Sequence, residues 1–397
     1  MTRLNISIDV ESDESVFIPY SRQNINAVDI EKVCEVLRSE FLTQGPVVPT
    51  FEKAVAEKFN AKCAVAVNSA TSALHIACLA LGVGPRDTVW TSPNTFVATA
   101  NCARYCGASV DFVDIDPRTW CMSVKDLQQK LEHHQAENLS LPKIVIPVHL
   151  SGQSCNMQSI YELGQQYGFR IIEDASHAIG GSFQKAPVGS CLYSDITVFS
   201  FHPVKIITTG EGGMALTNDK KLADHMARLR THGITRDSKQ LTHEPDGPWY
   251  YEQLELGFNF RMTDIQAALG LSQFGRLEDF VVRRNELAQR YDEALTVMAV
   301  QLQRVPNDVY STRHLYVIRV PSERHCNIFK SLRDKGIGVN LHYMPVHLQP
   351  YYRKLGFQEG DFPEAEKHGQ EAISLPLFPS LTDSEQDHVI VTLRSLI

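Results

Sequence analysis

One lysine and one aspartate stand out because each follows a short apolar run of the kind that forms a buried strand. Lys205 lies just past the run 196–200, within the segment SFHPVKIITTGEGG. Asp174 ends a second run that begins at residue 170. A lysine amine forms a Schiff base with the aldehyde of pyridoxal 5'-phosphate (PLP), and a carboxylate pairs with the protonated pyridine nitrogen of that cofactor. The two residues together predict a PLP enzyme.

Each of these residues also has a structural explanation. Most lysines are solvated surface residues, and a lone aspartate often caps a turn. Lys205, however, lies in a segment that is otherwise poor in charge, where burial would lower its pKa and leave the neutral amine that Schiff-base chemistry requires. An ionised Asp174 would keep the pyridine nitrogen protonated. His177, three residues further on, is either a core histidine or a hydrogen-bond partner beside the ring.

Two further segments could hold the rest of the cofactor. Residues 68–72 lie between a strand-like and a helix-like run, where small hydroxyl residues either cap the helix or mark a phosphate site at its N-terminus. Ser200 could add a hydroxyl group to that phosphate. Phe96, in SPNTFVATAN, is either a core residue or a stacking partner for the ring.

The secondary-structure pattern explains how these residues could meet. Candidate strands cover 64–67, 88–91, 110–113, 144–148, 170–173, 196–200 and 213–217, with helices expected at 71–81, from 124 and at 157–167. This alternation predicts an α/β fold with a mostly parallel sheet covered on both faces. Ligands of such sheets gather at the carboxyl ends of the strands. The flagged segments lie at such ends: 68–71, 92–96, His149, 174–177 and 200–205.

The remaining segments predict a second, smaller domain. One long amphipathic helix is expected at about 266–295, and a shorter mixed α/β pattern follows from residue 300, ending in a helix near 383–396. We therefore predict a flexible acidic tail at 1–16, a large PLP-binding domain at 17–275 and a small C-terminal domain at 276–397.

The composition excludes several other classes. A net charge of −8 over 397 residues argues against a nucleic-acid partner. No apolar stretch approaches the roughly 20 residues that span a bilayer, so no membrane partner is expected. The N-terminus lacks an apolar signal core, and the nine cysteines form no CxxC pair. These features predict free thiols, no metal site and a cytoplasmic location.

A glycine-rich segment also has to be explained. Residues 210–215 match the dinucleotide pattern G-x-G-x-x-A. That pattern should follow a strand and open a helix. Here a loop precedes it and a strand-like run follows it, so we reject an NAD-dependent enzyme.

Four separated motifs, SATSALH, EDASHAIGG, SFHPVKIITTGEGGM and LGFNFRMTDIQAALGLSQ, occur in the order of one known family. Together they resemble the DegT/StrS-type sugar aminotransferases, a branch of the fold-type I PLP enzymes. The resemblance runs from about Ile18 to the C-terminus. It implies a large domain with a mostly parallel seven-stranded sheet and a smaller C-terminal α/β domain.

The resemblance also implies roles for single residues. Lys205 would hold PLP, and its freed amine would move protons while an amino group passes from L-glutamate to a keto sugar. Asp174 would face the pyridine nitrogen, His177 would lie beside the ring and Phe96 would stack on it. The phosphate cradle is matched by Ala70, Thr71 and Ser200.

Family members are similar in being homodimers that share active-site residues. Asn259 matches a residue that reaches the partner's phosphate, with Arg261 nearby. Positions that line the sugar-nucleotide site in the family are matched here by Tyr20, Glu40, Phe41, Leu42, Thr43, His342, Tyr343, Met344 and Pro345. Their structural explanation is that they form a turn, a dimer contact or the core of the small domain.

Within the family, segments such as FLTQGP and LHYMPVHLQPYYRKLGF are most similar to the transaminases of pseudaminic acid biosynthesis. This implies a UDP-4-keto-6-deoxy-N-acetyl hexose as acceptor. A sugar aminotransferase with another keto-sugar acceptor and a PLP-binding regulatory protein without turnover stay open as alternatives. His177 replaces the glutamine of many members. Lys205 favours transamination over the dehydration catalysed by relatives that carry histidine there.

Overall fold

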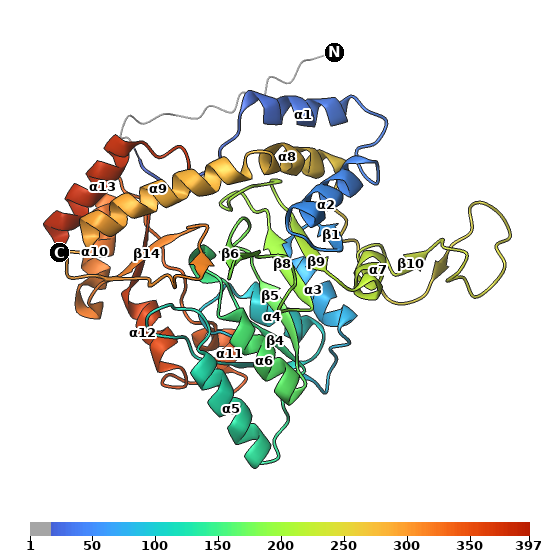
Figure 1. The fold of residues 1–397 in the computed structure, drawn as a ribbon, viewed down its shortest axis with the longest axis horizontal. Helices are drawn as coiled ribbons and strands as arrows, with labels where there is room; N and C mark the ends of the chain where they lie inside the picture. Colours follow the sequence, from blue (N-terminus) through green and yellow to red (C-terminus); the bar gives the residue numbers. More distant parts are fainter. Residues whose placement is uncertain (1–16) are drawn as a thin grey trace.

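The fold is built around one large sheet (Figure 1). The computed structural model describes residues 17–397, so the predicted tail at 1–16 lies outside the described residues. The seven strands lie in the order β1-β9-β8-β5-β4-β2-β3. Their bounds are β1 (Cys63–Val67), β2 (Thr88–Thr91), β3 (Ser109–Phe112), β4 (Ile144–Ile146), β5 (Arg170–Asp174), β8 (Ile196–Ser200) and β9 (Gly213–Thr217). All the apolar runs that were predicted to be strands thus belong to this sheet.

The strand directions confirm a mostly parallel α/β sheet. β3, β2, β4, β5 and β8 pair in parallel, whereas β9 is antiparallel to both β8 and β1. The carboxyl ends of β2, β4, β5 and β8 therefore meet at one edge. β9 begins at that edge with Gly213, so the predicted glycine-rich loop leads into a strand rather than a helix, as the sequence indicated.

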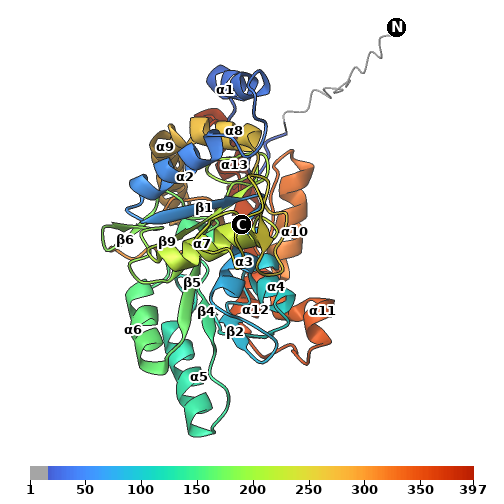
Figure 2. The same ribbon diagram turned by 90° about the vertical axis from the view of Figure 1, so that its right-hand side faces the viewer.

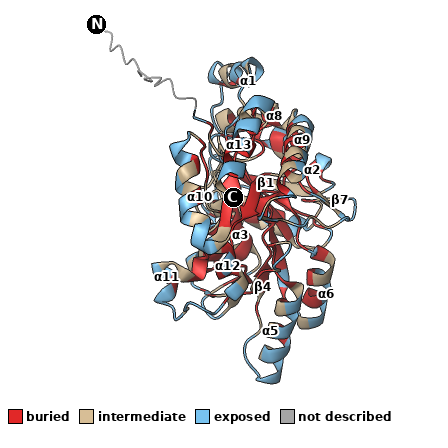
Figure 3. Ribbon diagram, turned by 90° about the vertical axis from the view of Figure 1, so that its left-hand side faces the viewer, coloured by how far each residue is buried: buried red, intermediate tan, exposed pale blue. Residues whose placement is uncertain are grey.

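Both faces of the sheet are covered by helices (Figure 2). Alternate residues of a strand enter different apolar cores: in β8, Val198 lies in one core and Phe199 in another. This pattern is typical of parallel sheets, which are buried on both sides. Figure 3 shows the buried central strands and the exposed outer faces of helices such as α5 and α10. The helices of this part are α1 (Ala27–Leu37), α2 (Val47–Lys58), α3 (Ala70–Ala80), α4 (Ala98–Tyr105), α5 (Val124–Ala136), α6 (Met157–Tyr167) and α7 (Lys220–Leu229).

The expected single helix at 266–295 is wrong, because the segment forms two helices. α8 (Asp264–Phe274) and α9 (Leu277–Leu295) are separated at Gly275 and Arg276. Glycine is a poor residue for a helix interior. Arg276 also forms an ion pair with Asp29 of α1 and donates to Asn24 Oδ1 at 2.9 Å. These long-range contacts hold the chain at the break.

The C-terminal part adds a three-stranded antiparallel sheet, β12-β14-β15. Its strands are β12 (Gln301–Leu302), β14 (Tyr316–Arg319) and β15 (Ala372–Leu375), and its helices are α10 (Ser322–Asp334), α11 (Pro350–Arg353), α12 (Pro363–Glu371) and α13 (Asp383–Leu396). Ile18 packs into the apolar core of this C-terminal part, while Val346 and Ala365 pack into the apolar core of the large sheet. The domain boundary at 275 stays a prediction.

The short strands form two peripheral sheets. These are β13-β6-β7 and β10-β11, with bounds β6 (Ser182–Phe183), β7 (Ala186–Pro187), β10 (Ile234–Thr235), β11 (Glu252–Gln253) and β13 (Val309–Tyr310). Between β10 and β11 the chain projects from the body (Figure 1). Within residues 17–397, no helix is both long and apolar enough to cross a membrane.

Candidate active site

A cavity of about 710 Å³ opens at the carboxyl edge of the sheet. Residues that follow β1, β2, β4, β5 and β8 contribute to its wall. Of the predicted site residues, it is lined by Tyr20, Ala70, Thr71, Phe96, Asp174, His177, Ser200, Lys205, His342 and Tyr343. His149, which the sequence also flagged, is fully buried beside Glu173 and does not line the cavity.

Lys205 lies in a tight loop after β8. Its backbone N–H donates to His202 O at 2.9 Å, and Ser21 Oγ donates to the neighbouring Val204 O at 3.1 Å, which ties the loop to the N-terminal segment. Burial lowers the pKa of Lys205 from 10.5 to about 8, although the negative charge of Asp174 opposes the shift. The neutral amine that the sequence analysis required is therefore accessible near pH 8.

Asp174 is held at the end of the central strand β5. The residue is 5% exposed, and its two carboxylate oxygens have different partners. Oδ2 accepts from Thr99 Oγ1 at 2.6 Å, and Oδ1 accepts from the Ser176 backbone N–H at 3.1 Å. The preceding residue, Glu173, points to the opposite face of the sheet, where it meets His149. The carboxylate next to the cavity is thus the one that the sequence selected.

His177 presents one ring nitrogen to the cavity. Its Nδ1 accepts from the Ser151 backbone N–H at 3.3 Å, so the neutral ring carries its proton on Nε2. Nε2 lies 3.2 Å from Tyr343 Oη. Burial, reinforced by the charge of Lys205, lowers the pKa of His177 well below 6.5. His177 is therefore a neutral hydrogen-bond donor at this wall.

The start of α3 provides an anion site. Ser69 caps the helix by accepting from the Ser72 N–H, which leaves the N–H groups of Ala70 and Thr71 without acceptors inside the helix. A Cβ on Gly213 would lie 2.5 Å from Ala70 N. Glycine at this position therefore allows the helix N-terminus to approach β9, where Ser200 pairs with Gly213.

Aromatic residues form the remaining wall. Phe96 is 59% exposed although it lines the cavity, and its ring centroid is 6.3 Å from that of Tyr343. The Tyr20 ring lies 5.5 Å from the ring of His342. An apolar side chain that stays uncovered inside a cavity offers its face to a flat ligand.

These residues fit PLP. The amine of Lys205, the carboxylate of Asp174, the donors at the start of α3 and the ring of Phe96 line one cavity. Their chemistry matches the aldehyde, the ring nitrogen, the phosphate and the ring face of that cofactor.

Eight predicted residues do not line this cavity. They are Glu40, Phe41, Leu42, Thr43, Asn259, Arg261, Met344 and Pro345. Phe258 and Phe260 stack on each other with centroids 4.8 Å apart, on one side of an extended segment. Successive side chains of such a segment alternate, so Asn259 and Arg261 point to the other side.

Thr99 and His314 are two of the cavity-lining residues that sequence reasoning missed. Thr99, in the first turn of α4, donates to Asp174, and its spacing of four from Thr95, which precedes the helix, was the available signal. His314 is 1% exposed, lines the cavity and packs on His177 with ring centroids 4.5 Å apart. No local pattern identifies His314, because its neighbour in space lies far away in the chain.

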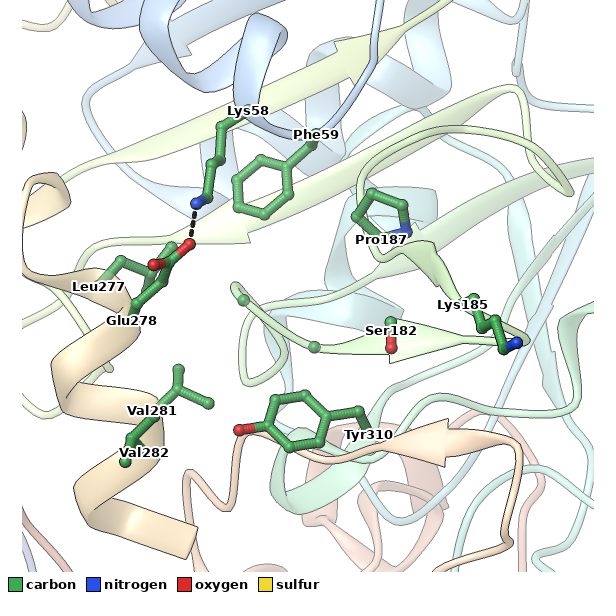
Figure 4. A pocket seen from close by; sticks show the side chains of 12 residues that line it. Lys58, Phe59, Ser182, Lys185, Pro187, Leu277, Glu278, Val281, Val282 and Tyr310 are labelled. Atoms are coloured by element: carbon green, nitrogen blue, oxygen red, sulfur yellow. Dashed lines mark hydrogen bonds and ion pairs between the residues drawn. The ribbon is translucent and has the colours of Figure 1, made fainter.

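A second hollow, of about 320 Å³, lies between α2, α9 and the small sheet of β6 (Figure 4). Lys58 and Glu278 form an ion pair across its rim, and Val281 and Tyr310 line its wall. It contains none of the predicted site residues. The predicted catalytic and cofactor-binding residues therefore lie in the cavity at the sheet edge and not in this second hollow.

Comparisons with known proteins agree with this site. Residues 23–394 match the DegT/DnrJ/EryC1/StrS aminotransferase family. The spore coat polysaccharide biosynthesis protein SpsC of Bacillus subtilis is 39% identical over 388 residues, which cover 96% of this chain and 97% of SpsC.

Two solved structures are similar along nearly the whole chain. The PLP form of Spr1654 from Streptococcus pneumoniae, a candidate sugar aminotransferase, has a TM-score of 0.86 at 30% identity and covers 96% of this chain and 98% of its own. Helicobacter pylori PseC, an aminotransferase involved in the biosynthesis of pseudoaminic acid, also has a TM-score of 0.86 at 30% identity, over 96% of this chain and 99% of its own.

Fold and site thus define a PLP-dependent aminotransferase. The chain belongs to the DegT/DnrJ/EryC1/StrS family of sugar aminotransferases, which transfer an amino group from a donor to a keto sugar.

The lowered pKa of Lys205 predicts how cofactor capture depends on pH. We expect the rate at which cofactor-free protein captures PLP to rise with pH and to level off above a midpoint near 8, because only the neutral amine attacks an aldehyde. Stopped-flow absorbance measures this rate, and N-acetyl-lysine corrects for the titration of PLP itself. A midpoint near 10.4, the value of an ordinary lysine, would contradict the desolvation of Lys205.

Proposed function

We propose that this protein transfers the amino group of L-glutamate to C4 of UDP-2-acetamido-2,6-dideoxy-β-L-arabino-hex-4-ulose, in pseudaminic acid biosynthesis. The single observation that carries the chemistry is the presence of Lys205 and Asp174 in one cavity, at the ends of neighbouring strands. The similarity to PseC supports the acceptor. A family member with a different keto-sugar acceptor is the alternative, since SpsC of spore coat polysaccharide biosynthesis is also similar.

We assign each part of the bound cofactor to the residues that would hold it. PLP supplies an aldehyde that takes up the amino group of one substrate and passes it to the next. Asp174 would keep the ring nitrogen protonated, His177 would donate from Nε2 to the ring oxygen, and Phe96 would cover one face. Ala70, Thr71 and Ser200 would bind the phosphate.

Lys205 would move the protons. With its amine free, Nζ would take the proton from the α-carbon of L-glutamate and pass it to the cofactor, and in the second half-reaction it would carry a proton from the cofactor to C4 of the sugar. A pKa of about 8 suits both tasks, because a general base is most effective when its pKa is near the working pH. The wall of Tyr20, His342 and Tyr343 would orient the sugar nucleotide.

We also propose a homodimer in which Asn259 and Arg261 serve the site of the partner subunit. Neither residue lines the cavity of its own chain. The backbone of Thr43 bridges to Thr263, so the predicted segment 40–43 lies beside them. Phe41 is 51% exposed in this surface, which supports its burial against a second copy. Met344 and Pro345 would border the same sugar-nucleotide site.

The proposed location is the cytoplasm, where L-glutamate is available and thiols stay reduced. All nine cysteines are free, which supports a reducing compartment.

The substrate proposal is tested by the visible spectrum of the PLP-loaded protein. L-Glutamate should convert the yellow form to the pyridoxamine form. After desalting, UDP-2-acetamido-2,6-dideoxy-β-L-arabino-hex-4-ulose should restore the yellow form, whereas buffer without sugar should not. Restoration by a different UDP-4-keto sugar alone would replace the proposed acceptor. If no amino donor changed the spectrum, the proposed transaminase activity would be contradicted.

The shared site is tested by subunit complementation. We expect a heterodimer of a Lys205→Ala chain and an Asn259→Ala/Arg261→Ala chain to be more active than either parent homodimer. The reason is that one of its two sites then combines Lys205 from one chain with intact partner residues from the other. Differently tagged chains are co-expressed, and the mixed species is isolated and assayed for turnover. Activity no higher than the mean of the parents would place each site within a single chain.

A further inference from the structure

Two threonines connect the first turn of α4 to the carboxylate of Asp174. Thr99 Oγ1 lies 2.6 Å from Asp174 Oδ2, and Thr95 Oγ1 lies 2.8 Å from Thr99 Oγ1. Thr95 is 2% exposed and Thr99 is fully buried, although both border the cavity. Both side chains are therefore shielded from bulk water, which competes for hydrogen bonds at exposed sites.

The direction of each hydrogen bond follows from the chemistry of the groups. An ionised carboxylate only accepts, so Thr99 must donate its single hydroxyl proton to Asp174. The contact between the two hydroxyl groups can then form only if Thr95 donates to Thr99. The two hydrogen bonds therefore form a relay in which Thr95 donates to Thr99 and Thr99 donates to Asp174.

This use of a threonine differs from the usual one. A threonine near a helix start commonly donates to the backbone carbonyl four residues earlier. Thr50 of α2 does so, with its Oγ1 2.8 Å from Pro46 O. Thr91, which is also fully buried, donates to the backbone of a neighbouring strand at Ile146 O, again at 2.8 Å. Thr99 donates to a side chain of the site instead.

The hydrogen bonds from Thr95 through Thr99 orient the side chain of Asp174, which is the part of this residue that the sheet leaves free. Backbone hydrogen bonds fix the main chain of Asp174, which donates to Pro147 O at 3.0 Å and accepts from the His149 N–H at 3.0 Å. The side-chain torsions stay free in such a strand. Thr99 on Oδ2 and the Ser176 N–H on Oδ1 hold the carboxylate plane in one orientation, with lone pairs left for a ligand.

We propose that Thr99, oriented by Thr95, is a positioning residue that aims the Asp174 carboxylate at the ring nitrogen of PLP. The proposal rests on the cofactor assignment made above, in which Asp174 faces that nitrogen. The same helix start carries Phe96, so one turn of the chain orients the carboxylate and offers an aromatic face to the ring.

The test compares two ligands that differ at one ring atom. Cofactor-free protein is titrated by equilibrium dialysis with PLP and with its 1-deaza analogue, in which C–H replaces the ring nitrogen. Thr99→Val removes the hydroxyl group while keeping the shape. We expect Thr99→Val to bind PLP roughly ten-fold more weakly, the size of a lost hydrogen bond to a charged group. The affinity for the deaza analogue should not change.

Two variants serve as controls. Thr99→Ser keeps the hydroxyl group and should recover most of the affinity for PLP. Thr91→Val removes an equally buried hydrogen bond that does not reach Asp174, so it should lower the melting temperature without changing the preference for PLP over the analogue.

The outcomes separate this proposal from the assignment on which it rests. Asp174→Asn should abolish the preference for PLP over the deaza analogue. If Asp174→Asn does so but Thr99→Val weakens both ligands equally or neither, the positioning role is overturned while the assignment of Asp174 holds. If Asp174→Asn leaves the preference intact, the assignment itself fails, and the positioning role fails with it.

Discussion

The parallel pairing of β4, β5 and β8 is the constraint on which the site depends. Because these strands run in one direction, the residues after them emerge at one edge. Asp174 ends β5, and the loop that carries Lys205 follows β8. The antiparallel β9 then starts beside this edge, where Gly213 lets the N-terminus of α3 come close. The sheet topology and this close approach bring a carboxylate, an amine and an anion site together.

Desolvation then sets the protonation states of the site. It lowers the pKa of Lys205 to about 8, and it lowers the pKa of His342 to about 3, with the charge of Lys205 adding to the latter shift. The cavity therefore combines neutral imidazoles with an amine that can lose its proton. In the same cavity, the Asp174 carboxylate accepts hydrogen bonds from the Thr99 hydroxyl group and the Ser176 N–H. A site of this kind binds a polar ring and still allows proton transfer at a lysine.

Much of this arrangement could be predicted from the sequence, because it depends on local patterns. Apolar runs marked the strands, and the helix expected from residue 124 is α5, which Ser123 caps. The helix break at Gly275 could not be predicted from periodicity, because the long-range ion pair of Arg276 with Asp29 holds it. His314 was missed for the same physical reason: its role depends on packing against His177, far away in the chain.

We propose that Lys205 carries the cofactor, and chemical trapping is the most direct test of this assignment. The PLP-loaded protein is reduced with borohydride, digested and examined by mass spectrometry to locate the pyridoxyl group. We expect one modified lysine, Lys205, and no modification above background in a Lys205→Ala variant. Stoichiometric modification of another lysine, or of none, would contradict it.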